Sequence, residues 1–403
     1  MASAEDAYFA ANPPPRHLDE HTALARAFID AHAAAGRRVV LVTSGGTTVP
    51  LERQTVRFID NFSAGTRGAT SAEYFLAAGY AVVFLHRQFS LLPYSRHFSH
   101  SRDCFLDFLR EDADGRVGVR RGADYARVRA VLREYRAAKD ARRLLMLPFV
   151  TIGDYLHELR AVARLMRPLG PRGLLYLAAA VSDFFVPPER MAEHKIQSTD
   201  AASRFRAPQG PAGDGAGDGA GAGAGAGAGP GPVDDDDDDD AASSSEEAFD
   251  NFDASPRVPR SKRLVIDLDP VPKFLKNLVD GWAPQGMIVS YKLETDPAIL
   301  VHKARYSLDR YHHHLVIGNL LATRKWEVVF VSPGRADNWL RVPPPPSWAA
   351  EHGRPGWGDA EGRPLRADEL PREDPDTEIE DMIIPAVAEL HDAHIEAAAK
   401  KPS

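Results

Sequence analysis

The sequence predicts an α/β fold with a Rossmann-like parallel-sheet core and helices on both faces. Short apolar runs alternate with helical patterns along the chain, which is typical of a parallel sheet covered on both sides. Glycine pairs also follow the first apolar run, where βα turns of such sheets bind ligands. The runs that we expect to be strands are 38–43, 81–85, 144–149, 174–180, 287–290 and 315–317.

The helical segments follow from apolar spacing and end signals. Gly36 closes the first of them, as glycine does at helix C-termini. Pro385 lies inside the last one, so that helix either kinks or begins there. Residues 1–16 are rich in alanine and proline, and we expect them to be a flexible N-terminus. The predicted helices are 19–35, 69–78, 125–141, 151–166, 297–311 and 377–400.

Composition separates one segment from the rest. Residues 201–262 contain a GAGAGAGAG repeat, seven consecutive aspartates and the run SSSEE. Such a segment cannot bury enough apolar surface to offset its chain entropy. We therefore predict a disordered low-complexity insertion at 201–262. It interrupts a single α/β domain made of residues 17–200 and 263–403.

Composition also excludes several classes of protein. No apolar run approaches the roughly 18 residues of a membrane span, and no signal-peptide core is visible at the N-terminus. Cys104 is the single cysteine of the 403 residues, so no internal disulfide forms and a reducing, cytoplasmic compartment fits. The net charge is −8, and no basic face indicates nucleic-acid binding.

The stretch 43–70, TSGGTTVPLERQTVRFIDNFSAGTRGAT, follows the first predicted strand. Its glycines let backbone N–H groups approach an anion, and a helix N-terminus adds partial positive charge. The pattern is neither GxGxxG nor the P-loop. Spacing alone therefore leaves two interpretations open, which are a pair of phosphate-binding turns and a pair of ordinary αβ turns.

Three motifs together resemble a known family. They are NFSAGTRG at 61–68, YLAAAVSDFFVPPERMAEHKIQS at 176–198 and SYKLETD at 290–296. The combination resembles phosphopantothenoylcysteine synthetase of the eukaryotic stand-alone type, over roughly 38–200 and 263–335. The resemblance implies a homodimer with a dimerisation region added to the α/β core.

The resemblance also implies a reaction. The carboxylate of 4′-phosphopantothenate attacks the α-phosphate of a nucleoside triphosphate, pyrophosphate leaves, and an acyl-nucleotidylate remains. The amine of L-cysteine then displaces AMP, giving 4′-phosphopantothenoylcysteine. The family needs Mg²⁺ for this chemistry, and KLETD at 292–296 favours ATP over CTP.

Site residues follow from the motif positions. Nucleotide-binding positions are Gly45, Ser63, Gly65, Gly68, Tyr291 and Asn319, and Tyr291 stands where the family commonly has phenylalanine. Phosphopantothenate-binding positions are Asn61, Ala179, Ala180 and Asp183, with Arg57 lent to the neighbouring subunit. We expect the two alanines to offer backbone donors. Asn61 and Lys195 match catalytic positions, Lys195 on a mobile loop. The metal ligands are not indicated.

Each of these residues also has a structural interpretation. Arg57 could pair with Glu52 or Asp60, Asn61 could cap the helix that begins near Ser63, Asp183 could cap a turn, and Lys195 could be a solvated surface residue. Two other functions also remain. One is an NAD(P)-dependent oxidoreductase, which needs an acidic residue at the end of the second strand, where the sequence reads FLHRQ. The other is a non-catalytic nucleotide-binding scaffold.

Overall fold

The computed structural model describes residues 4–98, 105–120, 122–196, 264–351, 356–357 and 362–400. The predicted disordered insertion, 201–262, lies outside these residues, so it stays a prediction.

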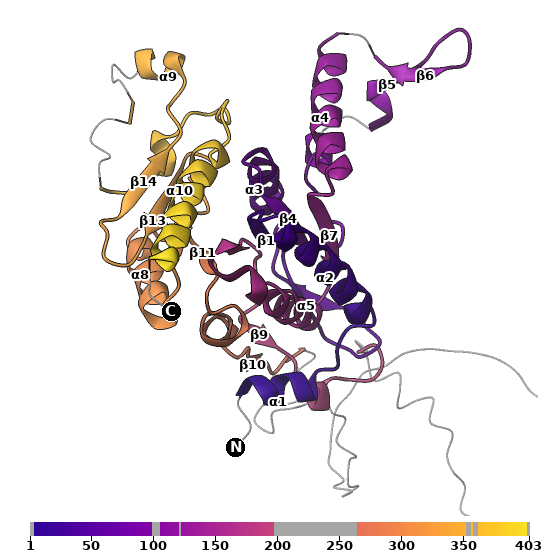
Figure 1. Cartoon of the computed structure of the whole chain (residues 1–403), viewed down its shortest axis with the longest axis vertical. Coiled ribbons are helices and arrows are strands. Elements are labelled where there is room, and N and C mark those ends of the chain that lie inside the picture. The colour runs from indigo at the N-terminus through magenta and orange to yellow at the C-terminus, as the bar shows by residue number, and fades with distance from the viewer. Residues whose placement is uncertain are drawn as a thin grey trace, which may run out of the picture.

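An eight-stranded sheet forms the centre of the molecule, in the order β14-β13-β12-β11-β8-β1-β4-β7 (Figure 1). The six strands from β12 to β7 are parallel, and β13 and β14 add an antiparallel edge. The predicted α/β class is therefore confirmed. The strands are β1 (Val39–Ser44), β4 (Ala81–Arg87), β7 (Leu144–Phe149), β8 (Gly173–Leu177), β11 (Met287–Glu294), β12 (Leu315–Leu320), β13 (Glu327–Val331) and β14 (Asn338–Arg341).

Helices cover both faces because the central strands are apolar on both. In β1, Val39 and Leu41 enter one buried cluster, whereas Val40 and Val42 enter the other. The first cluster packs under α2 (Leu18–Ala34) and α5 (Ile152–Leu165). The second packs under α3 (Thr66–Ala77) and α10 (Glu380–Ala399), while α8 (Leu300–Tyr311) covers β12 (Figure 1).

Smaller elements surround this core. The hairpin of β5 (Leu109–Glu111) and β6 (Val117–Val119) lies with α4 (Ala123–Asp140) at the far end of an arm that extends from the body (Figure 1). Two short ribbons, β2–β3 and β9–β10, lie near the carboxyl ends of the central strands. Their strands are β2 (Thr48–Pro50), β3 (Phe58–Asp60), β9 (Phe184–Phe185) and β10 (Asp269–Pro270).

The N-terminal segment differs from the expectation of a flexible chain. Residues Ala4–Ala11 form helix α1, in which Tyr8 and Phe9 are buried. Both rings pack against Phe274, and Phe9 also packs against Trp282. The alanine-rich composition hides these two aromatic anchors, whose burial holds the helix to α7 (Phe274–Asn277) and the π-helical turn Leu278–Trp282.

The structure settles the expectation about Pro385 and also defines the end of α8. Helix α10 begins at Glu380, before Pro385, so the proline lies inside the helix rather than at its start. Helix α8 ends at Tyr311, and His312 caps it in the left-handed conformation. His313 follows this cap and shares a 3.1 Å hydrogen bond with Ser290 Oγ. None of the helices that the structure describes is long and apolar enough to span a bilayer.

Candidate functional site

The carboxyl ends of β1 and β8 are joined by backbone hydrogen bonds. The N–H of Ala180 donates to Gly45 O at 2.8 Å, and the N–H of Thr47 donates to Ala180 O at 3.0 Å. The N–H of Ala179 donates to Thr43 Oγ1 at 3.2 Å. The expectation that the two alanines offer free backbone donors is therefore wrong, because both N–H groups are already used within the chain.

Close packing at this end of β1 accounts for the glycines. A Cβ on Gly45, whose φ is +83°, would lie 2.7 Å from Arg87 Cβ. A Cβ on Gly68 would lie 2.5 Å from the side chain of Ser44. A Cβ on Gly46 would come within 1.6 Å of the carbonyl oxygen of Asn61. Sequence reasoning missed Gly46, although the GG doublet was a visible signal.

Helix α3 begins at this packed turn. Its N-cap is Gly65, with φ +83°, so the interpretation of Asn61 as the helix cap is wrong. The N–H of Gly65 donates to Ser63 Oγ at 3.4 Å. The first N–H groups of a helix have no partner within it and carry partial positive charge, which suits an anion. Ser63, Gly65 and Gly68 thus lie together with Gly45, as predicted.

The segment after β4 covers this turn. The N–H of Leu91 donates to Ala64 O at 2.9 Å, and Ser90 Oγ lies 3.2 Å from the Cβ position of Gly65. That hydroxyl oxygen is buried and has no hydrogen-bond partner within the described part of the chain. No sequence motif marked Ser90, because only the fold brings it to the glycines.

Asn61 lies directly beside the turn. Its N–H donates to Thr47 O at 3.1 Å, which fixes the backbone against β2. The residue is partly exposed, and its carboxamide has no hydrogen-bond partner among the residues that the structure describes. A positioned amide with an available donor can stabilise a developing oxyanion.

Tyr291 lies on β11, which is separated from β1 by β8. Its hydroxyl lies 2.5 Å from that of Tyr176 on β8, and the Arg67 guanidinium lies 5.7 Å from its ring centroid. Burial is the main reason that the pKa of Tyr291 is raised well above its ordinary value, so the phenol is neutral near pH 7. Asn319 lies on β12, beside Leu293 of β11, and is largely buried.

Arg57 is paired within its own chain. Its Nη1 lies 3.0 Å from Glu52 Oε1 and donates to Ile196 O at 2.9 Å. Glu52 is fully buried, and its oxygens also accept from the N–H groups of Val56 and Arg57. Burial alone would raise the pKa of Glu52, but these hydrogen bonds outweigh it and lower that pKa. The alternative partner Glu52 is thus confirmed, in a pair whose carboxylate is buried and whose guanidinium is partly exposed.

Lys195 lies on the segment 192–196, next to Arg57. Asp183 follows β8, where the N–H of the neighbouring Ser182 donates to Thr47 Oγ1 at 3.0 Å. The N–H groups of Arg53 and Gln54 donate to Ala192 O and Glu193 O, so 192–196 runs along 52–57. Lys195 is exposed on that segment. Asp183 is also exposed, with Lys273 Nζ 3.4 Å from its carboxylate. The structure therefore places Lys195 with Arg57 in a 52–57 group. Gly45, Asn61, Ser63, Gly65 and Gly68 form a glycine-turn group, and β2 and β3 connect the two groups.

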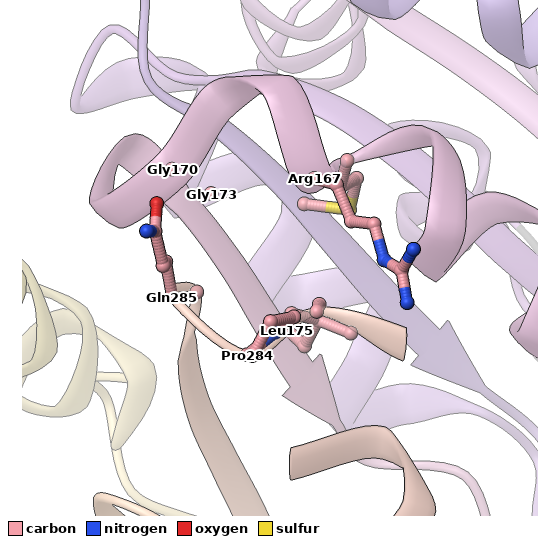
Figure 2. Close-up of a pocket in the computed structure, with 9 residues that line it drawn as sticks. Arg167, Gly170, Gly173, Leu175, Pro284 and Gln285 are labelled. Carbon is pink, nitrogen blue, oxygen red and sulfur yellow. The ribbon is translucent and has the colours of Figure 1, made fainter. Parts of the chain in front are cut away.

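A cavity of about 280 Å³ lies elsewhere. Gly173 begins β8 and Gly286 precedes β11, so this cavity is at the amino ends of the strands, opposite the glycine turns. Figure 2 shows Gln285 and Arg167 on its sides. Arg167 Nε donates to Trp282 O at 3.1 Å and so holds the chain before β11. Ligands of parallel sheets bind at the carboxyl ends, so this cavity is not the candidate site.

Comparisons with known proteins agree on one family. No protein-family model matches the chain. The Saccharomyces cerevisiae protein "Phosphopantothenate--cysteine ligase CAB2" is 44% identical over 341 residues, covering 84% of this chain and 80% of the relative. A human phosphopantothenate–cysteine ligase is 40% identical, covering 74% of this chain and 77% of the relative.

A solved structure gives the same result in three dimensions. It is a histidine-to-alanine mutant of Cab2 in complex with phosphopantothenate-cysteine. Its TM-score with this chain is 0.71 at 39% sequence identity, and the match covers 98% of this chain and 99% of the other. A second structure of a Cab2 mutant has a TM-score of 0.70 at 40% identity.

Proposed function

The chain belongs to the phosphopantothenate–cysteine ligase family of coenzyme A biosynthesis, and from that premise we propose that it joins 4′-phosphopantothenate to L-cysteine through an acyl-nucleotidylate. One structural observation supports this most directly. Gly45, Gly65 and the first turn of α3 lie together at the carboxyl edge of the sheet, beside Asn61. The edge suits a nucleotide, and Asn61 suits acyl chemistry.

In the first half-reaction a carboxylate oxygen of phosphopantothenate attacks the α-phosphorus. The bond from that phosphorus to pyrophosphate breaks, so an acyl-nucleotidylate forms. The backbone N–H groups at the start of α3 hold phosphate oxygens, and the buried Ser90 hydroxyl adds a donor beside Gly65. Lys195 adds a compact positive charge to the triphosphate when its segment approaches from the 52–57 side.

In the second half-reaction the cysteine amine attacks the acyl carbon. The carbon–oxygen bond to AMP breaks, the amide forms, and the nitrogen releases a proton to solvent. The carboxamide of Asn61 donates to the carbonyl oxygen as negative charge develops there. The backbone bond from Asn61 to Thr47 keeps that donor in place before the substrate arrives.

Mg²⁺ fits this site chiefly through the nucleotide. Mg²⁺ usually binds substrate phosphates with one or two carboxylates and several waters. The described residues contain no cluster of three or more metal-ligating side chains. Asp60, which precedes Asn61 and pairs with Arg87, is a candidate carboxylate at this edge. Bound there with the triphosphate, the ion would neutralise charge on the leaving pyrophosphate.

The proposal extends to assembly, nucleotide and compartment. Arg57 Nη1 makes both of the guanidinium contacts found in the described segments, so Nη2 and Nε can reach a ligand in a neighbouring subunit of a homodimer. ATP is the favoured nucleotide because of the KLETD motif at 292–296. A cytoplasmic location follows from the single cysteine.

Isotope transfer tests the mechanism. Phosphopantothenate labelled with ¹⁸O in its carboxylate is incubated with the enzyme, ATP and cysteine, and the nucleotide products are analysed by mass spectrometry. Attack on the α-phosphorus transfers one ¹⁸O to AMP. Recovery of the label in inorganic phosphate, with ADP as the product, would replace the acyl-nucleotidylate by an acyl phosphate. The same assay with CTP tests nucleotide choice.

A further inference from the structure

Three hydroxyl groups form a continuous chain beneath the predicted nucleotide site. Ser71 Oγ of α3 lies 3.0 Å from the hydroxyl oxygen of Tyr176 on β8. That oxygen lies 2.5 Å from the hydroxyl oxygen of Tyr291 on β11. Ser71 and Tyr176 are completely buried. These hydrogen-bonded hydroxyl groups thus connect α3, which begins at the glycine turn, with Tyr291 on β11.

The two aromatic rings are also fixed relative to each other. The Tyr176 and Tyr291 centroids are 5.5 Å apart with an interplanar angle of 77°, which is an edge-to-face contact. Burial raises the pKa of Tyr176 to about 12, so both phenols keep their protons near pH 7 and can share a neutral hydrogen bond.

Arg67 contacts the Tyr291 ring through its guanidinium, which is itself held by two hydrogen bonds. Its guanidinium faces the Tyr291 ring, while Nη1 donates to Glu380 of α10 at 2.8 Å and Nη2 donates to Arg324 O at 2.6 Å. Arg67 belongs to the first turn of α3, next to the glycines that receive the phosphates in our proposed function. The Tyr291 ring is therefore held from two sides by residues that are anchored to α3.

We propose that Tyr176 is a positioning residue for nucleotide binding, which holds the Tyr291 ring through its hydroxyl so that the ring can stack on the nucleotide base. This inference rests on the proposed function, because it assumes that Tyr291 contacts the base. A planar base binds more tightly to a ring that is already oriented, because binding then does not cost the entropy of ordering that ring. The partner of this site is thus the aromatic base of a nucleoside triphosphate.

The hydrogen bond makes the two tyrosines interdependent. Removing the Tyr176 hydroxyl leaves the hydroxyl of the partly buried Tyr291 without this partner, and we expect the ring to shift to regain a hydrogen bond. Removing both hydroxyls leaves no unpaired hydroxyl at position 291, so the double change should weaken ATP binding less than the Tyr176 change alone. Ser71 Oγ loses the Tyr176 hydroxyl in both variants, so that loss does not distinguish them. The hydrogen-bonded hydroxyl groups therefore predict that the effects of the two substitutions on the KM for ATP are coupled. Independent packing contacts would not show such coupling.

A double-mutant cycle of Tyr176→Phe and Tyr291→Phe tests this coupling. We expect Tyr176→Phe to raise the KM for ATP roughly tenfold. Tyr291→Phe should raise it about threefold, and the double variant should match Tyr291→Phe. The KM for phosphopantothenate should stay within about twofold in all three. Tyr80→Phe is the control, because it removes another buried phenol hydroxyl that hydrogen-bonds a side chain, His391 Nδ1 at 3.0 Å.

Each outcome decides the matter. The inference would be overturned if Tyr176→Phe raised the KM for ATP by the same factor in the wild-type enzyme and in the Tyr291→Phe enzyme. It would also be overturned if Tyr176→Phe left the KM for ATP unchanged. If Tyr176→Phe does not fold, Tyr291→Phe alone decides, since its KM for ATP must rise. Tyr291→Ala separates the two proposals. If it leaves the KM for ATP unchanged, the nucleotide site itself is misplaced. If it raises that KM while Tyr176→Phe does not, only the positioning role fails.

Discussion

The backbone N–H of Ala180 donates a 2.8 Å hydrogen bond to the carbonyl oxygen of Gly45. This bond joins the segments that follow β1 and β8, so the turn predicted for phosphate and the alanines predicted for phosphopantothenate move as one unit. Asn61 joins the same unit through Thr47. The site is therefore built from backbone contacts among segments far apart in sequence, and small changes in its glycines should disrupt several contacts together.

We expect Gly46→Ala to abolish activity and to lower the melting temperature. The new Cβ would lie 1.6 Å from Asn61 O, a backbone atom that cannot turn away, so Asn61 must shift from the site. Overpacking typically costs about 1–3 kcal/mol. Steady-state kinetics and thermal unfolding measure both effects. Gly118→Ala is the control, because its Cβ would meet no atom within 4 Å. A Gly46→Ala enzyme with normal activity and stability would contradict this packing.

The proposed homodimer predicts complementation between two inactive variants. Arg57→Ala and Asn61→Ala lie in different halves of a shared site, so a mixed dimer has one site that bears neither defect. Mixing the two chains should restore activity, to at most about half of the wild-type value for a fully mixed population with independent sites. Native mass spectrometry verifies that mixed dimers form. Verified mixed dimers without activity would show that Arg57 serves its own chain, in which it already pairs with Glu52.

We expect Asn61→Asp to slow the second half-reaction more than the first. The change removes the amide donor while keeping the side-chain shape, and loss of one oxyanion donor typically costs about 10²–10³-fold in rate. Rapid-quench measurement should show a first-turnover burst of pyrophosphate, followed by slow formation of product. Equal slowing of both steps would indicate that Asn61 holds the backbone next to Gly46 and takes no part in acyl transfer.

Buried histidines predict acid instability. Burial lowers the pKa values of His313, His314 and His391 to about 4, so the unfolded chain binds more protons than the folded chain between about pH 6.5 and 4. The stability from these neutral rings is fully present above about pH 6.5 and is lost as the pH falls. Glu158 has the opposite effect on stability. Burial raises its pKa to about 7, so stability is lost as the pH rises and this carboxyl ionises.

The His391→Gln variant isolates the contribution of one buried histidine to the pH dependence of the unfolding free energy. His391 Nε2 donates to Pro171 O at 2.9 Å, and a glutamine can keep that donor without titrating. Each such histidine contributes at most about 1.4 kcal/mol of unfolding free energy per pH unit. Urea unfolding between pH 6.5 and 4.5 should therefore show a shallower pH slope for His391→Gln than for the wild type. Identical slopes would mean that His391 is not buried in the neutral form.

Local sequence patterns were enough to predict helices and strands, but not the contacts between segments that are far apart in the sequence. The predicted strand 38–43 is β1, Val39–Ser44, and the predicted helix 151–166 is α5, which begins at a Thr151–Asp154 capping box. Nothing local shows that Glu52 is buried, since its charge suggests the surface. Val56 and Arg57 are local partners, but the N–H of Ile196 also donates to Glu52, and that contact forms only in the folded chain.

The same limit explains what was missed at the site. The motifs identified the glycines, but the approach of Gly46 to Asn61 and of Ser90 to Gly65 depends on chain segments that meet only in the folded sheet. The hydroxyl of Tyr291 looked like an unexplained departure from phenylalanine. In the structure this hydroxyl hydrogen-bonds that of Tyr176, 115 residues away in the sequence.

Pyrophosphate release measured with each substrate omitted in turn tests the central claim most directly. With purified enzyme, Mg²⁺ and ATP, we expect phosphopantothenate alone to give about one equivalent of pyrophosphate per active site, and added cysteine to give continuous release with phosphopantothenoylcysteine as the product. The account would be contradicted if pyrophosphate formed without phosphopantothenate, or if phosphopantothenate and cysteine together gave no pyrophosphate with either ATP or CTP.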